Sequence, residues 1–277
     1  MKQSATLIAA AIAVVVTLPV GAQMMLHDDG MGGGRRSMIN LVSPADSPIQ
    51  IRRGVLMIGQ YMSSMGSTMM RAPVPGGDST KEELYDFGEH ILRRGMAVFA
   101  FDGPGQGLVS TKLKLRPDFE VPIRTVTDFV LKRSDVDGKR LAIGGISYGG
   151  LFACRAAAFD DRFKAVVSAS SWYTPAGRFP SMDPLSQTGL RQYMGEDAQG
   201  VQDSITMAGA AERLKVPLLQ IYGGLDKASP PEHAYRVEKE VKGPTTTLVF
   251  DDGVHVCNNL HHIVRPLIAD WLADRLL

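Results

Sequence analysis

The sequence has few cysteines and almost no net charge. Its 277 residues include two cysteines, Cys154 and Cys257, which excludes a disulfide-dense scaffold. One bridge between them is open, because spacing alone does not show that two cysteines are close. Lysine and arginine total 30 against 29 for aspartate and glutamate, so the formal net charge is +1. This balance gives no basis for a nucleic-acid partner or a polybasic membrane surface.

Metal and phosphate motifs are also missing. The chain has no H-E-x-x-H or C-x-x-C pattern, so we expect no metal site and no cofactor. The glycine-rich run Gly103-Pro104-Gly105-Gln106-Gly107 lacks the lysine and the Ser/Thr of a phosphate loop. The expected partner is therefore a small-molecule substrate, and the sequence gives no oligomeric state.

No apolar run is long enough for an ordinary membrane span of about 20 residues. The run Leu7–Leu18 follows Lys2 and is broken by Pro19, and the small residues Val20-Gly21-Ala22 come next. This three-part pattern predicts a signal peptide at residues 1–22, cleaved after Ala22, and hence a secreted or periplasmic protein without stable membrane insertion. An uncleaved membrane anchor and a mis-assigned start codon are the alternatives.

Apolar strands alternate with helices along most of the chain. Residues 23–70 form a poorly defined N-terminal segment with a candidate strand at Gly54–Tyr61, and residues 71–277 form one domain. Expected strands in that domain are Met96–Phe101, Leu141–Ile146, Phe163–Ser168, Val216–Tyr222 and Thr245–Phe250, and Met69–Pro75 is a weaker one. The first expected helix follows a capping-box pattern at Ser79 and Glu82 and stops at Gly95. The other expected helices are Pro122–Ser134, Tyr148–Phe159, Pro231–Val241 and Asn258–Leu277. The alternation predicts an α/β fold with a mostly parallel sheet flanked by helices, and sites at the carboxyl ends of its strands.

The turn Gly145-Ile146-Ser147-Tyr148-Gly149 matches G-x-S-x-G and lies between an expected strand and an expected helix. This is the context of a nucleophile elbow, so Ser147 is the candidate nucleophile. A glycine-rich turn with an incidental serine is the alternative. The new helix would direct its N-terminus toward negative charge that develops at the site.

An acid and a histidine follow at two later strand ends. Asp226 comes after the strand that ends at Tyr222, and His255 comes after the strand that ends at Phe250. The order serine, acid, histidine is that of an α/β-hydrolase triad. His255 can take the serine proton and return it to a leaving group, while Asp226 fixes its tautomer. The other histidines fall in expected helices or near the N-terminus: His27, His90, His233, His261 and His262.

An oxyanion hole needs two backbone donors. The N–H of Tyr148, next to the nucleophile, is one candidate. The second is expected in the loop around Gly77 and Asp78, where glycine lets the backbone approach a substrate. A flexible turn is the alternative for this loop.

Three stretches together resemble one branch of the α/β-hydrolases, which includes 2,6-dihydroxypseudooxynicotine hydrolase and FrsA-like esterases. They are Gly76–Glu83 (GGDSTKEE), Phe101–Gly107 (FDGPGQG) and His255–Leu277. The resemblance covers about residues 75–277 and implies the α/β-hydrolase fold and a Ser–Asp–His triad. It also implies hydrolysis of an ester, or of a carbon–carbon bond beside a carbonyl.

Residues 174–213 have few strong apolar runs and lie between two expected strands, where this fold can carry a small cap or lid. An ordinary surface excursion is the alternative. Trp172 and Tyr173 are candidate substrate-pocket residues, and Phe179 and Tyr193 could join them.

The sequence thus predicts a serine hydrolase that cleaves a carboxylic ester or related acyl bond of a small molecule through an acyl-enzyme. Carbon–carbon hydrolysis beside a ketone is the first alternative, and peptidase action is a weaker one. The alternative from a different class of protein is a catalytically impaired binding protein on the same fold, suggested by the arginine and two prolines in Met69–Pro75.

Overall fold

The computed structural model describes residues 15–17, 55–59 and 81–277. Its strands are β1 (Val15–Thr17), β2 (Val55–Gly59), β3 (Ala97–Phe101), β4 (Leu141–Ile146), β5 (Phe163–Ala169), β6 (Leu218–Gly223) and β7 (Thr245–Phe250). The α-helices are α2 (Tyr85–Leu92), α3 (Glu120–Val130), α4 (Tyr148–Phe159), α5 (Pro184–Met194), α6 (Ala198–Asp203), α7 (Glu232–Glu240) and α8 (His261–Leu276). Short 3₁₀ helices are η1 (Lys81–Leu84), η2 (Gly107–Thr111), η3 (Phe179–Ser181), η4 (Ala211–Arg213) and η5 (His255–Leu260).

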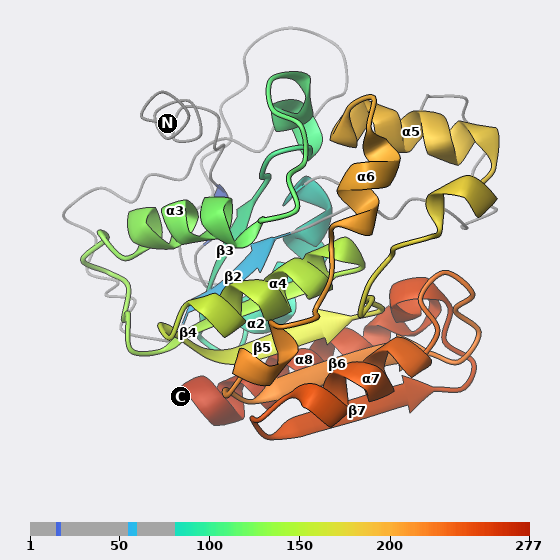
Figure 1. Ribbon diagram of the computed structural model, residues 1–277. Coiled ribbons are helices and arrows are strands. Elements are labelled where there is room, and N and C mark those ends of the chain that lie inside the picture. Colours follow the sequence, from blue (N-terminus) through green and yellow to red (C-terminus); the bar gives the residue numbers. More distant parts are fainter. Residues whose placement is uncertain (1–14, 18–54, 60–80) are drawn as a thin grey trace, which may run out of the picture.

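The strands form one sheet in the order β1-β3-β2-β4-β5-β6-β7 (Figure 1). Every neighbouring pair is parallel except β1 with β3, which is antiparallel. Val55 of β2 is in register with Ala97 of β3 on one side and with Leu141 of β4 on the other. The chain therefore changes direction across the sheet between β3 and β4, and the crevice at such a switch point is where open α/β sheets bind ligands.

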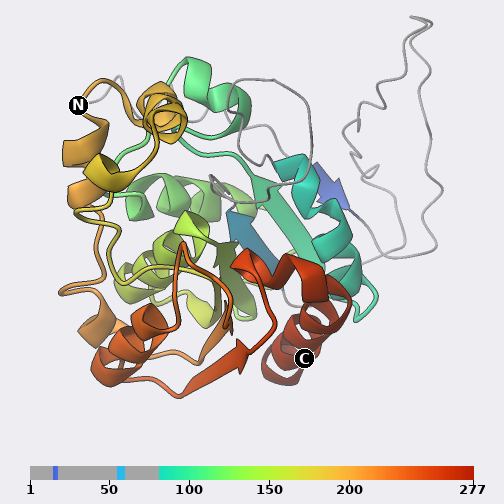
Figure 2. The ribbon, with the colours of Figure 1, turned by 90° about the vertical axis from the view of Figure 1, so that its right-hand side faces the viewer.

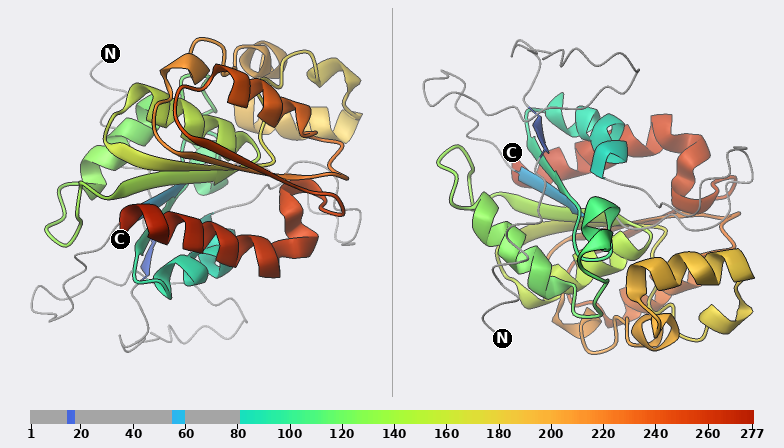
Figure 3. Two further views of the ribbon diagram at one scale, coloured as in Figure 1. Left: turned by 90° about the horizontal axis from the view of Figure 1, so that it is seen from below. Right: turned by 90° about the horizontal axis from the view of Figure 1, so that it is seen from above.

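Helices cover both faces of the sheet. Figure 3 shows α3, α4 and α7 on one face and α2 and α8 on the other. The strands are buried on both sides: in β3, Phe99 and Phe101 pack in the cluster of α3 and α4, while Val98 and Ala100 pack in the cluster of α2 and α8. This two-sided burial explains why the strands are almost continuously apolar in sequence.

The α/β-hydrolase fold expected from the sequence is the fold observed, and all five expected strands of the main domain are present. The candidate strand Gly54–Tyr61 contains β2. The weak strand Met69–Pro75 lies outside the described residues. Val15–Thr17 (β1) falls inside the segment expected to be a signal peptide. The other residues of that segment lie outside the described part of the chain.

The expected C-terminal helix Asn258–Leu277 is wrong in its first turn. The chain there forms the 3₁₀ helix η5, and α8 begins only at His261. Val256 and Cys257 have φ values of 58° and 51°, which no regular right-handed helix accommodates. The kink lies inside η5, directly after His255, and η5 continues to Leu260.

Residues 174–213 pack on the same core as α4. They contain η3, α5, α6 and η4, which lie on the α4 side of the sheet in Figures 1 and 2 and away from α2 and α8. Leu190, Met194 and Ile205 are almost fully buried in the core cluster that includes α4. We call this stretch the cap segment.

The two cysteines are free and buried in different core clusters, Cys154 in that of α4 and Cys257 in that of α8. No bridge forms between them. Within the described ranges, no helix has the length and hydropathy needed to cross a bilayer.

Candidate active site

Ser147 lies at a sharp turn between β4 and α4. Its φ and ψ are 57° and −128°, a conformation that a non-glycine residue rarely adopts and that marks local strain. A Cβ on Gly145 would be 2.1 Å from the Gly149 carbonyl oxygen, and one on Gly150 would be 2.6 Å from the Ser168 Oγ. The first glycine of the G-x-S-x-G pattern, Gly145, is therefore required by space, and Gly150, which follows the pattern, is closely packed as well.

Ser147, His255 and Asp226 form a continuous chain of polar contacts. His255 Nε2 is 3.2 Å from Ser147 Oγ, and His255 Nδ1 is 2.7 Å from Asp226 Oδ2. With Nδ1 protonated and donating to the carboxylate, Nε2 is free to accept the serine proton. Ser147 is 1% exposed, so these contacts lie in a site from which bulk water is largely excluded.

The Asp226 carboxylate is held by the turn that follows it. Its Oδ1 accepts from the N–H groups of Ala228 and Ser229, at 2.9 and 3.1 Å. The Ser229 hydroxyl lies 2.8 Å from Asp226 Oδ2 and 2.7 Å from the Ser170 carbonyl oxygen, and its one proton serves one of them at a time. Burial alone would raise the pKa of Asp226, but His255 and Ser229 outweigh it, so the pKa of Asp226 lies below its ordinary value.

Close backbone packing sets the position of His255. A Cβ on Gly223 would be 2.3 Å from the Gly253 carbonyl oxygen, and one on Gly224 would be 2.6 Å from the Asp251 carbonyl oxygen. The two glycines after β6 thus let the loop after β7 lie directly on the Asp226 turn. This explains the Gly-Gly pair before Asp226 in the sequence.

Ser170 fixes the far end of the same loop. Its Oγ accepts from the Val256 N–H at 2.8 Å, next to His255. Ser170 itself has a φ of 46°. It therefore connects β5 to the histidine loop, and the sequence analysis did not single it out because nothing local marks it.

Only one of the two expected oxyanion donors lies in the described part of the chain. Tyr148 is the first residue of α4, and the N–H groups of a helix's first turn point away from the helix body, toward the Ser147 side. Gly77 and Asp78 lie outside the described residues.

The Tyr148 side chain is buried under the cap segment. Gln202 of α6 donates from Nε2 to the Tyr148 hydroxyl at 2.6 Å, and the Trp172 ring lies 4.5 Å from the Tyr148 ring. Burial raises the pKa of the Tyr148 hydroxyl, which stays neutral at ordinary pH. The residue beside the nucleophile is thereby anchored to the cap segment.

Trp172 and Tyr173 lie on different sides of the chain. The Trp172 ring is 6.2 Å from the His255 ring, and its indole N–H donates to the Ala228 carbonyl at 2.9 Å. Tyr173 points toward α7, where its hydroxyl donates to Glu240 at 2.8 Å. The structure brings Trp172 to the triad and leaves Tyr173 away from it.

Two motifs that carry the resemblance contact each other. Lys81 Nζ is 3.0 Å from Asp102 Oδ2, and the Lys81 N–H donates to Asp102 Oδ1 at 2.9 Å. Both side chains are buried, at 7% and 3% exposure. A Cβ on Gly107 would be 2.5 Å from Asp102 Oδ2, which accounts for that glycine. STKEE and DGPGQG therefore form one buried ion pair, which the sequence analysis did not foresee.

The other described histidines are not at the site. His90 lies in α2, His233 in α7, and His261 and His262 begin α8, as expected. Among residues 81–277 and the two short described strands, no three His, Cys, Asp or Glu side chains are grouped to hold a metal ion.

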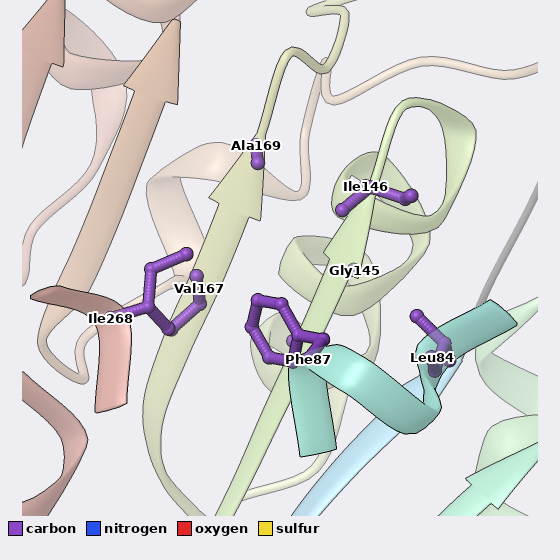
Figure 4. A pocket seen from close by; sticks show the side chains of 8 residues that line it. Leu84, Phe87, Gly145, Ile146, Val167, Ala169 and Ile268 are labelled. Atoms are coloured by element: carbon purple, nitrogen blue, oxygen red, sulfur yellow. The ribbon is translucent and has the colours of Figure 1, made fainter. Parts of the chain in front are cut away.

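An apolar pocket lies beside the elbow on the opposite face of the sheet from α4. Figure 4 shows Phe87 in front of β4, with Leu84 on one side of it and Ile268 of α8, next to Val167 of β5, on the other. Ile146, which precedes Ser147, also lines it. The sheet therefore separates this pocket from Trp172.

Comparisons with known proteins identify the family of the chain. The profile of the prolyl oligopeptidase family matches residues 84–267. The 2,6-dihydropseudooxynicotine hydrolase of Paenarthrobacter nicotinovorans is 29% identical over 73% of this chain and 56% of its own. The 20-hydroxy-prefusarin hydrolase of Gibberella moniliformis is 42% identical over 45% of this chain and 31% of its own.

A solved structure extends the fold comparison. The crystal structure of the 2,6-dihydroxy-pseudo-oxynicotine hydrolase superposes with a TM-score of 0.71 at 24% identity, over 96% of this chain and 65% of that one. The chain spans less than two thirds of each of these relatives. The resemblance seen in the sequence is confirmed, and the chain belongs to the prolyl oligopeptidase family, with the α/β-hydrolase fold.

Proposed function

We propose that the protein is a serine hydrolase that cleaves a carboxylic ester or related acyl bond of a small molecule. The observation that carries the proposal is the unbroken chain of contacts from Ser147 Oγ through His255 to Asp226, at 3.2 and 2.7 Å. These distances are within the reach that proton transfer between a nucleophile and its base requires.

In the proposed mechanism, Ser147 Oγ attacks the substrate carbonyl carbon while His255 Nε2 takes the hydroxyl proton. The carbonyl electrons move to the oxygen, where the Tyr148 N–H donates to the negative charge. As the carbonyl reforms, the bond to the leaving group breaks and His255 returns the proton to it. Water then attacks the acyl-enzyme with His255 again as base, and the acid product and free Ser147 result.

Asp226 keeps His255 in the tautomer and orientation that each step of this cycle requires. Ionised, it keeps Nδ1 of His255 protonated and stabilises the imidazolium that forms. Its contacts with the Ser229 and Ala228 N–H groups fix it on the side of the ring opposite Ser147.

We also propose that residues 1–22 are a signal peptide and that the mature protein is secreted or periplasmic. The support is the sequence pattern of Lys2, an apolar run and small residues before the cut.

The test uses residues 23–277, treated with a fluorophosphonate probe and mapped by intact mass and peptide analysis. One adduct on Ser147, absent after Ser147→Ala or His255→Ala, supports the proposal. The loss of activity in Ser147→Ala should be at least about 10³-fold, with thermal unfolding close to that of the parent. A Ser204→Ala variant, which changes an exposed serine of the cap segment, is the matched control and should label normally.

Reaction products then separate the two hydrolytic chemistries. Short neutral esters should give an acid and an alcohol, and β-diketones should remain intact. Cleavage of β-diketones without ester turnover would replace the ester proposal by carbon–carbon hydrolysis. A folded sample without any adduct on Ser147 would contradict both and favour a binding protein.

A further inference from the structure

Arg178 is a cationic side chain of the cap segment that lies close to the proposed site. It precedes η3, it is half-buried, and its guanidinium carbon lies 5.1 Å from the centre of the Trp172 ring. Trp172 in turn lies 6.2 Å from the His255 ring. The guanidinium is therefore separated from the imidazole by no more than the sum of these two distances.

Arg178 has no anionic partner among the described residues. Other half-buried arginines of the chain are paired, such as Arg155 with Glu120 at 2.7 Å and Arg162 with Asp160. No hydrogen bond or ion pair of the Arg178 guanidinium occurs in residues 81–277. It faces the Trp172 ring and is within electrostatic range of Asp226, Tyr148 and His233. Burial lowers the pKa of Arg178, although a guanidinium remains charged at any ordinary pH.

Such an arrangement is costly unless an anion completes it. A partly desolvated charge without a counter-ion is unfavourable, and contact with an aromatic face compensates for only part of this. The nearby acid, Asp226, is already bound to His255 and to the Ser229 turn. The Arg178 guanidinium therefore presents a fork of N–H donors beside Trp172 that no side chain among residues 81–277 bonds.

A second polar group without a full set of partners lies in the cap segment. Gln202 is fully buried, and among the described residues its side-chain Oε1 has no hydrogen-bond partner, while its Nε2 bonds Tyr148. The Gly177 N–H, next to Arg178, bonds Asp203, next to Gln202. Two polar side chains without full partners therefore lie where the cap segment meets the elbow.

We propose that Arg178 binds a carboxylate of the substrate, so that the preferred substrates are esters carrying a free acid a few bonds from the carbonyl that Ser147 attacks. This inference rests on the proposed serine-hydrolase function and specifies its substrate class. Arginine suits the role because its planar fork matches a carboxylate with two parallel N–H···O bonds.

The experiment compares acidic esters with neutral isosteres. On the acyl side the pair is mono-4-nitrophenyl glutarate and 4-nitrophenyl 5-methylhexanoate, and on the leaving-group side it is 4-acetoxybenzoate and 4-tolyl acetate. In Arg178→Met we expect kcat/KM for the acidic member of at least one pair to fall about 10- to 100-fold relative to its neutral isostere, the value of one charged hydrogen-bond pair. Arg178→Lys should recover part of the selectivity.

The matched control is Arg191→Met. The Arg191 guanidinium lies 5.1 Å from the Phe179 ring, the same geometry as Arg178 over Trp172, but Arg191 is exposed on α5. The ratio of kcat/KM for the acidic ester to kcat/KM for its neutral isostere should not change in Arg191→Met. A merely structural role for Arg178 would lower the rates of acidic and neutral esters equally.

The failures of the two proposals are distinguishable. Normal labelling of Ser147 and turnover of neutral esters, with an unchanged ratio for both pairs in Arg178→Met, would overturn the inference and leave the hydrolase standing. Absence of labelling and turnover would overturn the hydrolase. Calorimetry of monomethyl glutarate on Ser147→Ala, with and without Arg178→Met, tests the carboxylate site without turnover: weaker binding in the double variant supports it, and equal binding or none overturns it.

Discussion

At the residue scale, Asp226 has more hydrogen-bond donors than orienting one imidazole requires. Its side chain is 1% exposed, and it faces two backbone N–H groups, the Ser229 hydroxyl and His255. A buried carboxylate with this many donors stays ionised despite its low-dielectric surroundings. The site therefore keeps its negative charge without a cation in permanent contact.

This predicts how the stability conferred by Asp226 depends on pH. Its pKa is lower in the folded chain than the unfolded value of about 3.9. Its contribution is therefore present above that unfolded pKa and is lost as pH falls through the folded value. Asp226→Asn should reduce the free energy of unfolding by about 1–3 kcal/mol at pH 7, and this difference should shrink steadily below about pH 4.

Urea unfolding of wild type and variant at pH 7, 5, 4 and 3 measures this. Asp161→Asn, an exposed acid in the turn before β5, is the control and should differ from wild type by less than about 0.5 kcal/mol throughout. A gap for Asp226→Asn that stays constant from pH 7 to pH 3 would contradict the prediction.

Residues of the site differ in how far the sequence could identify them. Ser147, Asp226 and His255 each follow a recognisable strand, and their order along the chain is informative, so the structure brings together the residues that were expected. Ser229, Ser170 and Arg178 have no such marker. Their roles depend on how loops after different strands approach each other, which no local pattern encodes.

At the element scale, the close packing of backbone atoms at the elbow limits which residues can occupy its positions. A methyl group on Gly145 would overlap the Gly149 carbonyl, and neither atom can move without breaking the turn that holds Ser147. Gly189 of α5, by contrast, has nothing within 4 Å of the position its Cβ would take.

We therefore expect opposite effects from the same substitution. Gly145→Ala should destabilise the fold by more than about 3 kcal/mol or prevent folding. Gly189→Ala should stabilise α5 by about 0.5–1 kcal/mol, since alanine loses less backbone entropy in a helix. Chemical unfolding measures both, and a Gly145→Ala variant of normal stability would show that the elbow is not as tight as these distances require.

Elements were more predictable than their ends. Apolar runs bounded by glycine and proline located β3 to β7, because strands buried on both faces leave a plain signal. The start of α8 was misplaced, since the apolar spacing of Asn258–Leu277 does not reveal that the chain up to Leu260 forms the 3₁₀ helix η5. At the kink inside η5, the Val256 N–H donates to Ser170 Oγ, a residue in another part of the chain.

At the scale of the whole molecule, the cap segment and the sheet share one core. Trp172, Phe179 and Leu190 belong to the same buried cluster as α4. Tyr148 belongs to it too, and Gln202 of α6 donates to the Tyr148 hydroxyl, so the cap segment is joined directly to the residue that follows Ser147. The sequence predicted an insertion here but not its contacts, because its short helices carry little amphipathic pattern.

The edge of the sheet provides the last prediction. β1 pairs with β3 over three residue pairs, and it lies inside the proposed signal peptide. Cleavage after Ala22 would remove it, so a chain that begins at Gln23 must be stable without it. A three-residue edge strand contributes little, and we expect the melting temperature of residues 23–277 to lie within about 4 °C of that of the full chain, equivalent to about 1 kcal/mol.

Differential scanning calorimetry of the two chains makes the comparison, with fluorophosphonate labelling of Ser147 as the check on the site. A fall of more than about 10 °C would mean that β1 contributes strongly to the stability of the sheet, and residues 1–22 would then be part of the folded domain instead of a signal that is removed.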